Sequence, residues 1–216
     1  MIKITKGKEP PEWRKVRNTP GISFENAPKD ALRISLLEEQ GGLCAYCMRR
    51  VSFTRGESTA TRIEHLKPRS LSIKEGKEEE TLAYGNMVLC CDGDIGRNEE
   101  YHCDRSKGDS TIHFNPFDQA VIDTISYSSK NGTIKSTNPV FDRDFNEILR
   151  LNHSRLEKNR LAVLKGLIIE IGRRKWRKKD IADRLSYYSG RTSNGQLHEY
   201  CGVIVWYLNK KLRQFG

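Results

Sequence analysis

Hydrophobic residues in the first two thirds of the chain occur in short stretches rather than at helical spacing. Such stretches, bounded by glycine, proline and polar residues, are typical of strands. The predicted strands are 51–54, 61–66, 87–91, 121–127 and 133–136. The last two flank Asn131-Gly132, a dipeptide that favours a tight hairpin turn. One amphipathic helix is predicted between Ala31 and Leu37, ending before Gly41-Gly42.

The spacing changes after Pro139, where apolar residues recur every three or four positions. This periodicity predicts helices with one apolar face each, and such faces most often pack against one another. The helical stretches are 156–171, 181–185 and 197–212. We therefore expect an α+β fold made of an irregular basic arm (1–28), a core (29–137) and a helical region (138–216).

The charge of the chain indicates the kind of partner. Its 216 residues include 38 lysines and arginines against 28 aspartates and glutamates, a formal net charge of +10. Between Arg150 and Asp180, eleven basic residues stand against three acidic ones. Such an excess suits nucleic acid, because each neutralised phosphate releases counterions, although a solvated helix face is the alternative. The residues expected to contact nucleic acid here are Arg173, Arg174 and Lys175.

No apolar run approaches the roughly 18–20 residues that cross a bilayer. The first residues, MIKITKGKEPPEW, are basic but lack the apolar segment of a secretory signal. A membrane or secreted protein is therefore not expected, and the expected location is cytoplasmic.

Six cysteines occur at positions 44, 47, 90, 91, 103 and 201. In a reducing compartment, closely spaced cysteines are typical metal ligands, since disulfides persist mainly under oxidising conditions. The Cys44-Ala-Tyr-Cys47 spacing lets two thiolates reach one tetrahedral Zn²⁺ at about 2.3 Å from each sulfur. Cys91 ends a predicted strand and Cys103 opens a predicted helix, and we expect them to supply the second pair.

Two choices within this ligand set stay open from the sequence. Cys90 and Cys91 are adjacent on a strand, so their side chains point to opposite faces. His102 is an alternative to Cys103 as a ligand. Cys201 lies among apolar helix positions and is expected in the core. We interpret the set as a structural zinc site, because a redox Cys-x-x-Cys pair belongs in a βαβ setting that this sequence lacks.

A second group of polar residues lies close to these cysteines in the sequence. Glu64 and His65 end one predicted strand, and Asn86 opens the next. Asp104 directly follows the last of the predicted zinc cysteines. An imidazole can act as a general base near neutral pH, and carboxylates are the ligands that Mg²⁺ and Mn²⁺ prefer.

The ordered runs CAYC, IEHLKP, YGNMVLCC and HCDRSKGD resemble the HNH, or ββα-metal, endonucleases in a zinc-binding form. The first residues and the run LLEEQGGLCAYCMRR are also similar to PtuB, the HNH subunit family of Septu-type and retron-associated antiphage defence systems. The specific motifs cover about residues 36–109. The resemblance implies a zinc-stapled ββα-metal core with an additional, mostly helical C-terminal region.

The resemblance also implies a role for each polar residue. His65 would act as general base on water, and Glu64 would bind a catalytic Mg²⁺ or Mn²⁺ that stabilises charge on the scissile phosphate. Asn86 would fix the loop that carries His65. Asp104 stands where the family often has His or Asn, and it would be the second ligand of the catalytic ion. The chain departs from the family in having Glu for the commoner Asp, in lacking the terminal histidine and in its insertion before Cys103.

Four further residues have weaker signals. Lys107, on the predicted helix after Cys103, is expected to contact a phosphate, with a merely solvated side chain as the alternative. His113, His153 and His198 have no comparable neighbours in the sequence, so structural or surface roles are expected for them.

These observations predict a metal-dependent HNH endonuclease that hydrolyses phosphodiester bonds, with DNA as the favoured substrate. The resemblance implies the effector of a bacterial antiphage system that works beside an ATPase subunit of the PtuA type. The chain contains no Gly-x-x-x-x-Gly-Lys-Ser/Thr motif, so control by ATP would come from that partner. Two alternatives stay open: RNA, for example tRNA, as the substrate, and a non-catalytic zinc-stapled module that binds nucleic acid or acts as an adaptor.

Overall fold

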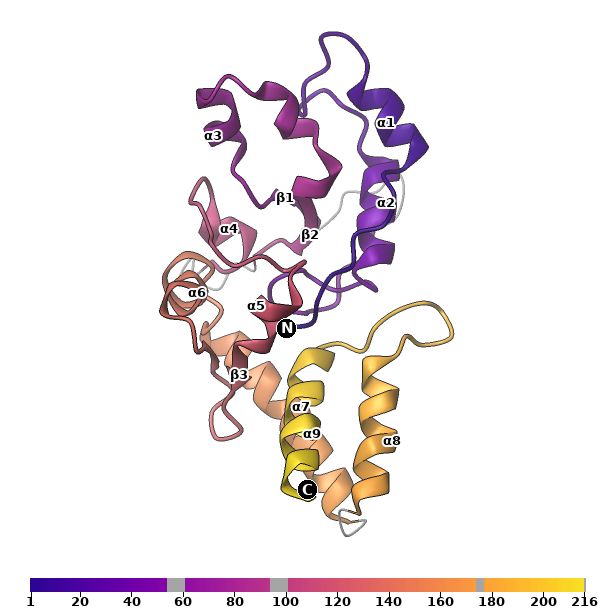
Figure 1. Ribbon diagram of the computed structural model, residues 1–216, viewed down its shortest axis with the longest axis vertical. Helices are drawn as coiled ribbons and strands as arrows, with labels where there is room; N and C mark the ends of the chain where they lie inside the picture. The colour runs from indigo at the N-terminus through magenta and orange to yellow at the C-terminus, as the bar shows by residue number, and fades with distance from the viewer. Residues whose placement is uncertain (54–60, 94–100, 174–176, 216) are drawn as a thin grey trace.

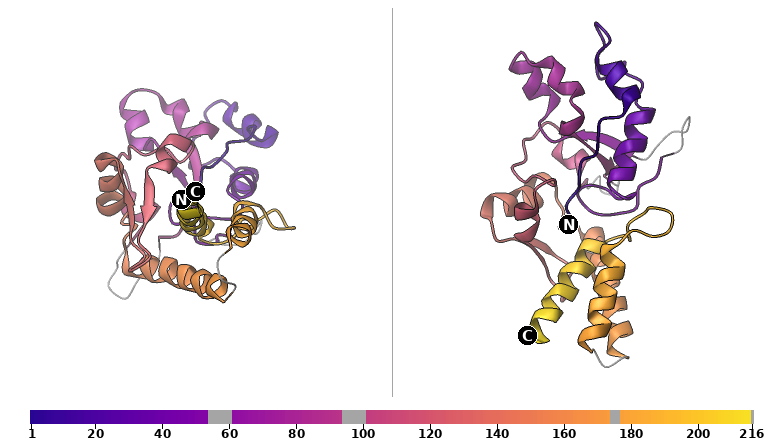
Figure 2. Two further views of the ribbon diagram at one scale, coloured as in Figure 1. Left: turned by 60° about the horizontal axis from the view of Figure 1, so that its bottom comes forward. Right: turned by 45° about the vertical axis from the view of Figure 1, so that its right-hand side comes forward.

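A computed structural model describes residues 1–53, 61–93, 101–173 and 177–215. The chain forms small antiparallel sheets and many helices, which confirms the α+β expectation. Helices α7, α8 and α9 lie together at one end of the molecule, and α1, α2 and α3 lie at the other (Figures 1 and 2). The helices are α1 (Pro11–Arg17), α2 (Asp30–Glu39), α3 (Arg69–Lys74), α4 (Asp104–Lys107), α5 (Gln119–Asp123), α6 (Pro139–Arg143), α7 (Ser154–Gly172), α8 (Lys178–Ser189) and α9 (Cys201–Leu212). The strands are β1 (Thr61–His65), β2 (Met87–Cys91), β3 (Ile125–Tyr127) and β4 (Ile134–Ser136).

The N-terminal segment is more ordered than its sequence predicts. Residues 1–28, expected to be irregular, contain helix α1, which begins directly after Pro10. Trp13 on this helix is 1% exposed, and its indole N–H donates to the carbonyl oxygen of Leu82 at 3.1 Å. A proline at the first helical position is compatible with a helix because its missing N–H would have no intrahelical partner there. The expectation of an irregular arm is therefore wrong for this part.

The predicted strands around the polar residues are present. Strands β1 and β2 pair antiparallel, with Glu64 opposite Val88 and His65 opposite Met87. Helix α3 lies between β1 and β2 in the chain, and helix α4 follows β2. The predicted strand at 51–54 is not found, since the described residues 51–53 lie outside any strand and Leu43 pairs with Arg50 instead.

The predicted hairpin at 121–136 is also present, but its first strand is shorter than expected. Residues 119–123 form helix α5, and only Ile125–Tyr127 pair with Ile134–Ser136. Asp118 ends the preceding loop, and its carboxylate accepts the N–H of Ala120 at 2.9 Å. This contact caps the start of a helix, which explains why the apolar stretch does not begin as a strand.

Helix α7 is attached to this hairpin through a buried arginine. Arg160 is 2% exposed and donates to the carbonyl oxygens of Gly132 at 2.6 Å and Leu151 at 2.8 Å. Gly132 has a φ of +78°, and a Cβ there would lie 2.2 Å from the carbonyl oxygen of Glu157. The turn can therefore approach the helix closely only with glycine at this position.

The C-terminal helices pack as their periodicity predicts. Helices α8 and α9 lie side by side, and α9 also packs on α7 and β3 (Figure 1). Cys201, expected in the core, is 1% exposed at the start of α9. Within the described ranges, none of the helices combines the length and the apolarity that crossing a bilayer requires.

Candidate metal centre and adjoining carboxylate site

The Cys44–Cys47 segment forms a tight turn that directs both thiols to one side. The amide of Cys44 donates to the carbonyl of Arg49 at 2.9 Å, and the amide of Met48 donates to the carbonyl of Cys44 at 3.1 Å. Met48 has a φ of 62°, a left-handed conformation that closes the turn. The amide of Ala45 donates to the carbonyl of Leu89 at 3.0 Å, which attaches the turn to β2.

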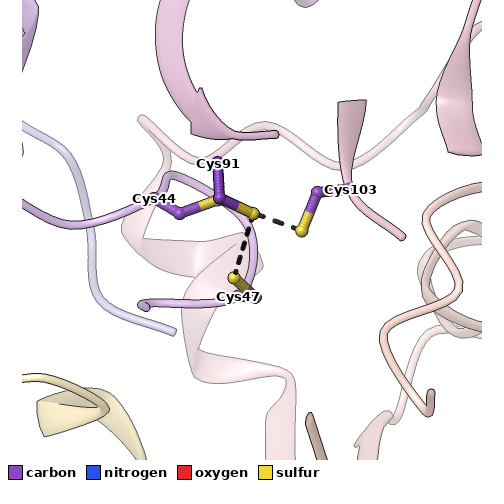
Figure 3. A group of neighbouring side chains, drawn as sticks. All are labelled: Cys44, Cys47, Cys91 and Cys103. Carbon is purple, nitrogen blue, oxygen red and sulfur yellow. Dashed lines mark hydrogen bonds between the residues drawn. The ribbon is translucent and has the colours of Figure 1, made fainter. Parts of the chain in front are cut away.

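Four sulfur atoms meet at this turn (Figure 3). Cys44 Sγ lies 3.9 Å from Cys103 Sγ, and Cys47 Sγ lies 3.7 Å from Cys91 Sγ. All four ligand atoms lie within 4.8 Å of one another, and all four side chains are buried. A tetrahedral Zn²⁺ at about 2.3 Å from each sulfur would place the sulfurs about 3.8 Å apart. The four cysteines therefore have the geometry of a zinc site.

The structure decides between the alternative ligands that the sequence left open. Cys91, rather than Cys90, lies in the four-sulfur group. Cys103 supplies the fourth sulfur, and His102 Nδ1 lies 3.2 Å from it. A hydrogen bond from this imidazole to a ligating sulfur would orient the ligand rather than replace it.

The thiols of the group differ in acidity. Burial raises the pKa of Cys47 and of Cys103 well above the usual value for a thiol. Burial acts in the same direction on Cys44, but hydrogen bonds from Cys103 and Cys47 outweigh it and hold the pKa of Cys44 below its usual range. The Cys44 thiol thus loses its proton more readily than those of Cys47 and Cys103, and the thiolate is the form that binds a metal.

The carboxylate of Glu64 lies on the face of β1 that α4 covers. Lys107 Nζ on α4 is 2.7 Å from Glu64 Oε1, and the two side chains are 1% and 6% exposed. The hydroxyl of Tyr46 donates to the same oxygen at 3.2 Å. Asp104 is within hydrogen-bonding reach of the Glu64 carboxyl group, so two acidic groups from different elements are adjacent.

The pKa of Glu64 reflects these neighbours. Burial and, to a smaller extent, the Asp104 carboxyl group raise this pKa to about 8, although the Lys107 ammonium group acts in the opposite direction. Two adjacent carboxyl groups repel each other when both are ionised, so both ionise easily only with a cation between or beside them. The pair is therefore suited to hold either a shared proton or a divalent cation.

Arg62 holds the second carboxylate of the pair. Its Nε lies 2.6 Å from Asp104 Oδ2, and its side chain is 50% exposed. Arg62 lies two residues before Glu64 on β1, so both side chains are on the same face of the strand. That same spacing in the sequence could have indicated Arg62 as a partner of the site.

His65 faces different neighbours. Its Nε2 is 2.8 Å from the carbonyl oxygen of Thr81. Its ring packs against the ring of Phe24 in a T-shaped arrangement, with the two centroids 4.6 Å apart. A carbonyl oxygen only accepts, so the neutral imidazole carries its proton on Nε2 and Nδ1 has a lone pair. Burial lowers the pKa of His65 to about 4, which keeps the ring neutral near pH 7.

Asn86 fixes the segment that follows His65. Its Oδ1 accepts the amide N–H of Lys67 at 2.8 Å, and its Nδ2 donates to the carbonyl of Lys67 at 3.0 Å. The amide of Leu66 also donates to the carbonyl of Asn86 at 2.9 Å. The Asn86 side chain thus fixes the backbone two residues after His65, which is the role expected of it from the sequence.

The structure brings together some of the predicted residues and separates others. Glu64, Asp104 and Lys107 meet, whereas the imidazole of His65 contacts Thr81 and Phe24. Adjacent residues on a strand alternate in direction, which accounts for the separation.

The expected phosphate contact of Lys107 needs correction. Its side chain is 1% exposed, and its ammonium group is bound by Glu64 and by the carbonyl oxygen of His65 at 3.1 Å. It therefore lacks access to a phosphate in this structure. Arg173 ends α7 and is exposed, whereas Arg174 and Lys175 lie outside the described residues.

No family model matches this chain, and no curated protein matches it.

Proposed function

We propose that this protein is a zinc-stapled, metal-dependent HNH endonuclease that hydrolyses phosphodiester bonds in nucleic acid. The observation that carries the proposal is the placement of two acidic side chains beside the four-cysteine group, Glu64 paired with Lys107 and Asp104 paired with Arg62. The order of β1, β2 and α4 and the motifs noted in the sequence agree with it.

The two carboxylates are suited to a hard cation. Mg²⁺ and Mn²⁺ prefer oxygen ligands, and Glu64 and Asp104 supply them from a strand and a helix. When bound, such an ion would stabilise the charge that develops on the scissile phosphate and on the leaving oxygen. The ammonium group of Lys107 is paired with the Glu64 carboxyl group, so it would have to move away from Glu64 when the ion binds.

His65 is suited to act on water. The Thr81 carbonyl holds the proton on Nε2, and among the described residues no hydrogen bond engages Nδ1. Nδ1 would accept a proton from water as the water oxygen bonds to phosphorus. The bond from phosphorus to the 3′ oxygen then breaks, which leaves a 5′-phosphate, and the leaving oxygen takes a proton from solvent water to become a 3′-hydroxyl.

The biological setting is part of the proposal and rests on the sequence resemblance. We place the enzyme in a bacterial antiphage system, where it would cut DNA, with RNA as the alternative substrate, together with an ATPase subunit of the PtuA type. The net charge of +10 supports a nucleic-acid substrate of either kind.

The test is cleavage of phage DNA and of total RNA by the zinc-loaded protein, with and without its ATPase partner, in Mg²⁺, Mn²⁺ or EDTA. We expect cleavage only with Mg²⁺ or Mn²⁺, and loss of at least about a hundredfold in rate for His65→Ala and for Glu64→Gln. The variants should keep their zinc and their thermal unfolding midpoint within a few degrees. Parental rates in His65→Ala would overturn the role of the base.

One observation favours a second candidate. Lys107 and Glu64 form a buried ion pair, and His65 is bonded to a backbone carbonyl, so both groups also have structural partners. A non-catalytic module that binds nucleic acid through its basic surface would have the same contacts. Binding without cleavage in every divalent metal, with the ATPase partner present, would support this candidate.

A further inference from the structure

A second pair of titratable groups lies outside the site described above. The loop between α4 and α5 contains His113, and the π-helical turn after α6 contains Asp144. The sequence analysis assigned His113 a structural or surface role, and nothing in the proposed reaction uses it. The two residues are 31 positions apart in the chain, so their contact is a product of the fold.

Asp144 orients the imidazole of His113 from a buried position. The Asp144 side chain is 1% exposed, and its Oδ2 accepts the amide N–H groups of His113 at 2.5 Å and Phe114 at 3.1 Å. These two bonds fix the loop. The other oxygen, Oδ1, lies 3.3 Å from His113 Nδ1, while the His113 side chain is 58% exposed. Nδ1 is thus directed to the carboxylate, and Nε2 is the ring nitrogen left for a ligand.

His113 borders a cleft that extends to the segment directly after His65. The cleft has a volume of about 390 Å³ and is lined by Lys67 and Asn86, among others. Leu66, which directly follows His65, is also in its wall. A second hollow of about 440 Å³ also has His113 in its wall and includes Arg143. A nucleic-acid strand placed across His113 would therefore pass beside the segment that carries His65.

The charges in these hollows favour an anion. The charged or titratable residues that line them are Lys67, His113, Arg143 and Asp144. Asp144 is the only acid among them, and it is covered by His113. Lys67 and Arg143 form ion pairs with glutamates at the surface, and exposed pairs of this kind are weak enough for a phosphate to compete with them.

We propose that His113, oriented by the buried Asp144, binds a backbone phosphate of the nucleic-acid substrate in the cleft that it shares with Lys67 and Asn86. The inference rests on the proposed function, because it presumes a nucleic-acid substrate. In the protonated ring, Nε2–H donates to a phosphate oxygen while Nδ1–H stays on Asp144. Phe117 in the same cleft offers an aromatic side chain to a neighbouring base.

The experiment measures binding rather than cleavage. The full-length, zinc-loaded protein is titrated against a labelled DNA duplex and, separately, an RNA hairpin, by fluorescence anisotropy in Ca²⁺ over a series of salt concentrations. The variants are His113→Ala and His113→Lys. The control is His198→Ala, which removes a half-buried histidine of the helical region. Because His113 is exposed, its variants should fold, and thermal unfolding checks this.

We expect His113→Ala to weaken binding about tenfold, as loss of one charged hydrogen bond predicts. The slope of log K against log salt should fall in magnitude by about 0.9 for the duplex, since one phosphate contact is lost. His113→Lys should restore most of the affinity and most of the salt-dependence slope. His198→Ala should change neither the affinity nor the slope. Unchanged affinity in His113→Ala, or weaker binding with an unchanged salt slope, would overturn the inference. If the wild-type protein binds neither nucleic acid, the proposed function itself fails instead.

Discussion

The ammonium group of Lys107 lies 2.7 Å from the carboxylate of Glu64, and both side chains are almost completely buried. A buried charge that loses its partner is costly, because water cannot replace the lost interaction. We therefore predict that Lys107→Met lowers the free energy of unfolding by about 3 kcal/mol. The measurement is urea unfolding of the zinc-loaded protein in the absence of other divalent ions.

A matched control is Lys67→Met, which removes a lysine whose ion pairs with Glu75 and Glu80 lie at the surface. We expect it to change stability much less than Lys107→Met. The double variant Lys107→Met/Glu64→Gln should recover part of the loss, because it removes the unpaired acid as well. A double variant no more stable than Lys107→Met would contradict the assignment of the energy to this pair.

The four-sulfur group predicts a stability that depends on zinc. Replacing Cys91 by Ser, or removing the metal with a chelator, should lower the thermal unfolding midpoint by at least about 10 °C, because metal binding contributes directly to folding. Zinc content measured by mass spectrometry should fall in parallel. Cys90→Ser is the control, since Cys90 is equally buried but lies outside the group. Equal zinc content in the Cys91 and Cys90 variants would show that the ligand set is different.

The buried imidazole of His65 predicts a loss of stability in acid. Its pKa is lowered to about 4 by burial, whereas an unfolded histidine titrates near 6.5. Between these values the unfolded chain binds a proton that the folded chain does not, so stability falls as the pH decreases from about 6.5 to 4. The contribution of this one group is about 3 kcal/mol.

The variant that tests this is His65→Gln, whose side chain does not titrate. Its stability should decrease less than that of the wild type over the same pH range, in chemical unfolding at constant ionic strength. His198→Gln controls for the loss of a histidine elsewhere. Parallel curves for His65→Gln and the wild type would show that the imidazole is not held neutral in the folded state.

The side chain of Asn86 predicts a local effect on its partner. Asn86→Ala removes both hydrogen bonds to the backbone of Lys67, and should lower stability by about 1–2 kcal/mol. Amide hydrogen exchange at Lys67 should become faster. The chain offers a close control: Asn152 holds the backbone of Ile134 through the same two atoms, at 2.8 and 3.0 Å. Asn152→Ala should release Ile134 and leave Lys67 protected.

Much of the local structure follows from the sequence. The short apolar stretch 87–91 predicts a strand, and a helix is expected to begin at Cys103; the structure has both. The Cys-x-x-Cys spacing indicated a metal site because two thiolates at that distance converge on a turn. These features depend on residues that are close together in the chain, so a local sequence pattern is enough to predict them.

The contacts between distant segments were harder to predict. Nothing in the run of residues around Lys107 shows that its side chain turns inward to Glu64, since a lysine near a helix end is usually solvated. The pair of Asp144 and His113 likewise depends on how a loop packs against the π-helical turn after α6. Helix α1 was missed because its proline-rich start is typical of irregular chain, whereas burial of Trp13 against the rest of the molecule stabilises it.

The buried guanidinium group of Arg160 has a consequence for how the protein can be divided. It belongs to α7 but donates to the turn at Gly132, on the other side of the boundary drawn at residue 138 from the sequence. A fragment that stops at this boundary would lose the Arg160 donor that binds the carbonyl oxygen of Gly132. The complementary fragment would expose the Arg160 guanidinium group, which is buried in the intact protein. Biochemists who wish to isolate residues 29–137 by truncation should therefore keep both halves together, or co-express them.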